Sequence, residues 1–130
     1  MGLTLNDIGG EVVKKDYRYE VKDNTHLKNL VVSSTTMKAN KSTNGHSHKG
    51  QEEVYMFIKG NGYMFLNEKK FMVKEGDVVL IEDGVFHRVE SGPAGIYFVC
   101  VFDGGRHDDE AQKLKEEADK INNLYTGKGT

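Results

Sequence analysis

Residues 40–60 read N-K-S-T-N-G-H-S-H-K-G-Q-E-E-V-Y-M-F-I-K-G, and this segment carries the clearest structural signal of the chain. It contains His46 and His48 one residue apart and then Glu53, while His87 follows further along the chain. Because side chains alternate along a β-strand, His46 and His48 are expected to point to the same face. Three imidazoles and a carboxylate suit a divalent transition metal and leave coordination positions for a substrate or water. The pattern therefore predicts a metal site.

A metal-free arrangement is the alternative interpretation of this pattern. In that arrangement the interior histidines would hydrogen-bond to one another and to Glu53. Burial of three imidazoles and a carboxylate without a metal costs free energy, because polar groups lose their contacts with water. This cost favours the metal site.

The composition limits the partners of the protein. Its 130 residues correspond to one domain with an ordinary hydrophobic core. With 18 basic and 20 acidic side chains, the net charge of −2 provides no basic surface for nucleic acid. Residues 1–10 show neither a signal peptide nor a membrane segment, so no membrane partner is expected. The single cysteine, Cys100, excludes an internal disulfide and agrees with a cytoplasmic location.

Short apolar runs separated by turn residues predict an all-β chain. Turns are expected at residues 60–62 and 91–95, and connections in the middle of the chain are too short for crossover helices. An antiparallel sandwich or small barrel follows from this spacing. Within it, Glu53, Tyr55 and Phe57 are expected to share the interior face of their strand. The expected strands cover residues 17–21, 27–37, 53–58, 63–66, 70–73, 78–81, 85–90 and 96–102.

The end of the chain has a different pattern. Residues 108–125 are charged and contain neither glycine nor proline. Apolar residues recur every three or four positions, which predicts an amphipathic helix that packs on the barrel or on a partner subunit. The apolar positions are Ala111, Leu114, Ala118, Ile121 and Leu124.

The order of residues around the histidine pair resembles the first motif of the cupin superfamily of small β-barrels. That motif has a glycine, His-x-His, a glutamate and a second glycine at set intervals. Glu53, rather than Glu52, keeps the six-residue interval before the second glycine. The positions are filled here by Asn40, His46, His48, Glu53 and Gly60.

A second cupin motif is recognisable around His87. Gly76, Gly84 and His87 keep the spacing of that motif. Glu82 replaces the usual proline, and Ser91 replaces the usual asparagine. Both motifs together span residues 40–91, and all four ligand positions are retained.

The resemblance implies a fold, a cofactor and an oligomeric state. The fold is an all-β cupin barrel (a double-stranded β-helix or jelly roll) over about residues 12–103 of a single domain, 1–130, with the helix at about 108–125 as an addition. The cofactor is one divalent transition metal ion per chain (manganese, iron, nickel or zinc), held by His46, His48, Glu53 and His87. A homodimer is the usual state, and the apolar outer face of residues 54, 56 and 58 agrees with it.

Such a site implies a metal-dependent enzyme that acts on a small polar substrate. The leading hypothesis is isomerisation of a sugar, a sugar phosphate or a keto or hydroxy acid. Dioxygen insertion at iron and non-catalytic binding of a small ligand are the alternatives. A short resemblance to archaeal cupin-type phosphoglucose isomerases includes His87-Arg88, and Ser42, Thr43 and Lys49 are then the available phosphate donors.

Other residues are assigned with less direct support from the pattern. Tyr55 and Phe57 are the candidate substrate-binding residues because they follow Glu53 on the same strand face. His26 precedes a strand and is interpreted as a surface or turn histidine. His107 lies beside acidic residues that are expected to cap the C-terminal helix. No residue is assigned as the catalytic acid or base.

Overall fold

The computed structural model describes residues 2–105, and these residues form an all-β fold, as predicted. No described helix is long and apolar enough to cross a membrane. The helix predicted for residues 108–125 lies outside the described residues. The strands are β1 (Glu11–Lys15), β2 (Tyr19–Asn24), β3 (Leu30–Met37), β4 (Glu53–Leu66), β5 (Lys69–Lys74), β6 (Val78–Ile81) and β7 (His87–Asp103).

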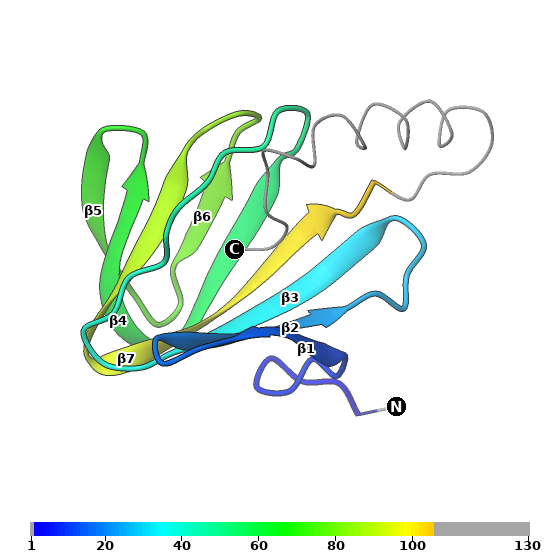
Figure 1. Ribbon diagram of the computed structural model, residues 1–130, viewed down its shortest axis with the longest axis horizontal. Helices are drawn as coiled ribbons and strands as arrows, with labels where there is room; N and C mark the ends of the chain where they lie inside the picture. Colours follow the sequence, from blue (N-terminus) through cyan, green and yellow to red (C-terminus); the bar gives the residue numbers. More distant parts are fainter. Residues whose placement is uncertain (1, 106–130) are drawn as a thin grey trace.

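Neighbouring strands in the sheet are hydrogen-bonded in the order β1-β2-β3-β7-β4-β5, and β6 pairs with β4. Every pair is antiparallel, as the short connections require. The long strands β4 and β7 pair along most of their length and belong to both halves of the molecule (Figure 1). One half of each strand continues into β3, β2 and β1, and the other half lies beside β5 (Figure 1).

The turns predicted at residues 60–62 and 91–95 are wrong, because both segments continue as strand within β4 and β7. The pairing of these strands shifts in register between Phe57 and Lys59 and again between Gly60 and Gly62. Bulges of this kind bend a strand without ending it. The glycines that suggested a turn therefore mark a bend between the two halves of the barrel.

The N-terminal strands also differ from the prediction. β1 was not predicted, and the strand expected at residues 17–21 is β2, which begins at Tyr19 and ends at Asn24. β3 begins at Leu30 instead of residue 27. All five residues of β1 are exposed, so the strand has no buried face whose alternation the sequence could show.

The interior face predicted for β4 is confirmed. Glu53, Tyr55 and Phe57 are 4%, 1% and 1% exposed. Tyr55 stacks on Phe98 of β7 with ring centroids 5.1 Å apart, and Phe57 lies against the same ring at 5.4 Å. This aromatic cluster fills the barrel beside Glu53 and fixes the strand that presents its carboxylate.

Candidate metal centre

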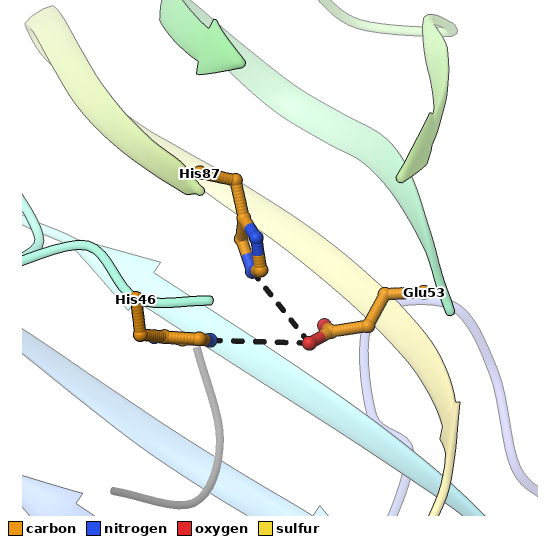
Figure 2. A group of neighbouring side chains, drawn as sticks. All are labelled: His46, Glu53 and His87. Atoms are coloured by element: carbon orange, nitrogen blue, oxygen red, sulfur yellow. Dashed lines mark ion pairs between the residues drawn. The ribbon is translucent and has the colours of Figure 1, made fainter. Parts of the chain in front are cut away.

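Three of the predicted ligands converge in the barrel interior. His46 lies in the loop before β4, Glu53 is the first residue of β4, and His87 is the first residue of β7. Their side chains point toward one another (Figure 2). One ligand atom from each lies within 4.8 Å of the others. Glu53 Oε1 is 3.9 Å from His46 Nε2 and 3.6 Å from His87 Nε2.

His46 is held against β7 by backbone hydrogen bonds rather than by a regular strand. His46 N donates to His87 O at 3.1 Å, and His87 N donates to His46 O at 2.9 Å. In place of the strand expected around His46 and His48, His46 alone forms an isolated β-bridge, which pairs it with His87. Gly45 and Gly50, both with positive φ, flank this segment and interrupt the extended conformation that a strand needs.

The loop that carries His46 is attached to β7 further upstream. Asn40 adopts a φ of 56°, the left-handed conformation expected at a position where the motif has glycine. The Ser91 hydroxyl accepts a hydrogen bond from Lys41 N at 2.9 Å and donates to Lys38 O at 2.6 Å. Thr43 Oγ1 accepts from Val89 N at 3.0 Å. Ser91 therefore performs the loop-holding role at the position where the motif has asparagine.

The orientation of His87 is set by two contacts. Its Nδ1 lies 3.0 Å from the carbonyl oxygen of Val85, which fixes Nδ1 as the donor and leaves Nε2 with a free lone pair. Tyr55 meets the His87 ring edge-on, with centroids 5.6 Å apart. A histidine held in this tautomer presents Nε2 to a metal.

His48 lies beside this group but is not one of the three residues whose ligand atoms lie within 4.8 Å. Its ring centroid is 4.6 Å from that of His46, so the two imidazoles share one region, as their spacing predicts. Burial lowers the pKa of His48, His46 and His87 lower it further, and Glu53 acts in the opposite direction. A neutral His48 is the form that can donate a lone pair to a metal.

The donor atoms fit a metal because they are buried and unsatisfied. Among the described residues, His46 Nε2, His48 Nε2, His87 Nε2 and Glu53 Oε2 are buried without hydrogen-bond partners. Burial alone would raise the pKa of Glu53, but His46 and His87 together lower it, so the carboxylate form is favoured. Buried polar atoms without partners are costly, and a divalent cation would satisfy those of the three residues that converge, with His48 beside them.

Comparison with known proteins identifies the family. The family described as Cupin domain matches residues 33–102, which is more than half of the 130-residue chain. The chain belongs to the cupin family. The matched residues include β4, β5 and β6, most of β3 and β7, and all of the predicted ligands.

Two relatives and one solved structure are similar to this cupin. Uncharacterized protein MJ1618 from Methanocaldococcus jannaschii is 36% identical over 56 residues, 42% of this chain and 45% of its own length. The oxalate-binding protein of Thermotoga maritima is 28% identical over 81 residues, 62% of this chain and 67% of its own. A structure titled as a predicted oxalate decarboxylase from Thermotoga maritima aligns with a TM-score of 0.66 and 23% identity, covering 79% of this chain and 98% of that one.

The candidate substrate-binding residues of this cupin lie deep in the barrel. Tyr55 packs between His87 and Phe98, and Phe57 packs against Tyr55 and Phe98. Burial raises the pKa of Tyr55 well above its usual value, so its hydroxyl stays protonated. Contact of either side chain with a substrate stays a prediction.

Two of the predicted phosphate donors are engaged in other contacts. Ser42 Oγ accepts a hydrogen bond from Arg88 Nη1 at 2.7 Å and donates to Thr43 O at 2.9 Å. Thr43 is buried and accepts from Val89 N. Lys49 is exposed. These three residues therefore do not form a prepared phosphate site in the described structure.

Two polar residues in the barrel interior were missed by the sequence analysis. Asp23 of β2 is paired with Ser33 of β3, and Ser33 is completely buried. The alternation of Tyr19, Val21 and Asp23 would have indicated an inward-facing carboxylate if the strand had been continued to residue 24. The prediction ended that strand too early.

Proposed function

We propose that this cupin is a metal-dependent enzyme that acts on a small molecule with adjacent oxygen atoms, in an isomerase-type reaction. The observation that supports it is the convergence of buried, unsatisfied nitrogen and oxygen donors at the metal centre. Mixed imidazole and carboxylate donors are typical of sites for manganese, iron, nickel or zinc.

The residues of the chain have defined roles in this proposal. His46, His48, Glu53 and His87 would hold one divalent ion, which supplies Lewis-acid stabilisation of negative charge on a bound oxygen. The Val85 carbonyl keeps the His87 tautomer that presents Nε2. Tyr55 and the aromatic cluster exclude water from one side of the centre. The acid or base of the reaction stays unassigned.

Non-catalytic binding of a small ligand is the second candidate function. It is favoured by the similarity to the oxalate-binding protein of Thermotoga maritima. A cupin dioxygenase is a third candidate and requires iron at the centre. All three candidate functions use the metal centre. They differ in whether the bound ligand is isomerised, is bound without reaction, or reacts with oxygen.

The metal centre is tested by metal analysis of protein purified without chelator. We expect about one ion per chain, and we expect His87→Ala to weaken metal binding at least about a hundredfold, because it removes a buried ligand. His26→Ala is the matched control, since His26 is an exposed histidine outside the barrel interior. Binding that is weak in the native protein, or unchanged in His87→Ala, would contradict the proposal.

The reaction class is tested on the metal-loaded protein. Interconversion of an α-hydroxy ketone and its aldehyde isomer, followed by NMR, supports the isomerase. Oxygen uptake with the iron-loaded protein supports the dioxygenase. Tight binding of a probe without either reaction supports the binding protein. In each case His87→Ala should abolish the response and His26→Ala should retain it.

A further inference from the structure

A row of polar side chains crosses the interior of the barrel toward the metal centre. Cross-strand pairing places Asp23 of β2 opposite Ser33 of β3, Ser33 opposite Cys100 of β7, and Cys100 opposite Tyr55 of β4. Directly paired residues share one face of a sheet. Because Ser33, Cys100 and Tyr55 are almost completely buried, the Asp23 side chain faces the same interior.

Two atoms at one end of this row have no partner that accounts for their burial. Asp23 Oδ1 and Ser33 Oγ are both buried and make no hydrogen bond of good geometry among the described residues, although the Ser33 hydroxyl is near enough to lower the pKa of Asp23. Buried polar atoms of this kind are uncommon and call for a partner from outside the chain. A hydroxyl or carbonyl group of a ligand would supply it, since a carboxylate accepts and a serine hydroxyl both donates and accepts.

The charge of Glu53 acts on Asp23. Burial raises the pKa of Asp23, the Ser33 hydroxyl acts against this rise, and the charge of Glu53 raises it further. The pKa of the Cys100 thiol is raised by its burial and by the negative charges of both Glu53 and Asp23. Asp23 and Glu53 therefore act on the same region of the interior.

The charge balance of the interior disfavours an anionic ligand. No lysine or arginine among residues 2–105 is buried, so the described barrel offers no buried lysine or arginine to pair with a ligand carboxylate or phosphate. The negative charges of Glu53 and Asp23 would together balance the charge of one divalent ion. A dianion added to this set would leave uncompensated negative charge in a region of low dielectric constant, whereas a neutral ligand would not.

We propose that Asp23 and Ser33 form a hydrogen-bonding subsite for a hydroxyl group of a neutral hydroxy-carbonyl ligand, and that this subsite discriminates against dianions such as oxalate. The inference rests on the proposed metal centre, which binds the adjacent oxygens of the same ligand. Among the possible substrates, the subsite therefore favours neutral sugar-like compounds over sugar phosphates and dicarboxylates.

The test compares two small probes, dihydroxyacetone and oxalate, by isothermal titration of the metal-loaded full chain. We expect the native protein to bind dihydroxyacetone more tightly than oxalate. Asp23→Asn keeps the size and one accepting oxygen but removes the charge, so oxalate should bind about tenfold more tightly. Ser33→Ala should weaken dihydroxyacetone binding about fivefold, as expected for one lost hydrogen bond.

Glu20→Gln is the matched control, because Glu20 lies on β2 but is paired with the exposed Thr36 and Lys15. It should change the binding of neither probe. The metal content is measured again after each titration, so that removal of the ion by oxalate is not taken for binding.

The outcomes separate this inference from the proposed function. Tighter binding of oxalate than of dihydroxyacetone by the native protein overturns the subsite, and this comparison needs no variant to fold. Unchanged oxalate binding in a folded Asp23→Asn protein also overturns it while the metal centre stands. Failure of the native protein to hold a metal refutes the proposed function itself.

Discussion

His48 differs from the other candidate ligands in its position, and its pKa is shifted. It lies beside His46 and outside the group formed by His46, Glu53 and His87. Its pKa is lowered from the usual 6.5, first by burial and then by its histidine neighbours. The native protein thus resists protonation of His48 more than the unfolded chain does. This difference has a consequence for stability.

We predict that the metal-free protein loses stability as the pH falls below about 6.5, partly through His48. The unfolded chain takes up the proton first, so the loss begins at the unfolded pKa and is complete below the lowered folded pKa. Uptake of one proton changes the free energy of unfolding by at most about 1.4 kcal/mol per pH unit. Because His48 is partly exposed, screening by solvent reduces the change to a fraction of this value. Urea unfolding in chelator at several pH values measures it.

The control for this prediction is another histidine. His48→Gln should show a flatter dependence of the unfolding free energy on pH than the native protein. His26→Gln, which changes an exposed histidine, should show the native dependence. Equal slopes in the native and His48→Gln proteins would contradict a role for His48.

The candidate ligands could be predicted from the sequence by their spacing, whereas Asp23 and Ser33 were not. His46, Glu53 and His87 belong to motifs with fixed intervals, and the structure brings them together as predicted. Asp23 follows the alternation of Tyr19 and Val21 and becomes visible only when the strand is extended beyond residue 21, while its pairing with Ser33 is not contained in local periodicity. The boundary of one strand decided the difference.

At the scale of the strands, the bend of β4 depends on close contact with β7. A Cβ added to Gly62 would lie 2.0 Å from the carbonyl oxygen of Glu90. A Cβ added to Gly60 would lie 2.2 Å from the carbonyl oxygen of Gly95, and Gly60 also has a φ of 79°. The glycines were interpreted as a turn because sequence shows only their conformational freedom and not the neighbouring backbone.

We therefore predict that Gly60→Ala destabilises the protein by about 2–4 kcal/mol, because strain in φ and a backbone clash act together. Gly76→Ala is the matched control for strain alone, since Gly76 has a φ of 92° and open space around the added Cβ. It should cost about 1 kcal/mol. Urea midpoints measure both. Equal effects of the two substitutions would show that the contact with β7 adds no destabilisation beyond the strain in φ.

For the whole molecule, the outer face of β6 is an apolar and exposed strand surface. Val78 and Leu80 are 59% and 69% exposed, while the intervening Val79 and the following Ile81 are buried. Their cross-strand partners Met56 and Val54 are only partly buried. An apolar strip on paired strands is typical of a protein interface. It is the surface that agrees best with the homodimer expected from the family.

We propose that a second copy of the chain covers this strip, and we predict that Leu80→Glu converts a dimer into a monomer. A two-fold axis would bring the same residues of both copies together, so one substitution places two carboxylates in an apolar interface. Sedimentation velocity at micromolar concentration measures the change. Met72→Glu is the control, because Met72 is 74% exposed but lies on β5, away from β6. If the native protein is a monomer, or if the Leu80→Glu protein is still a dimer, the outer face of β6 is not the dimer interface.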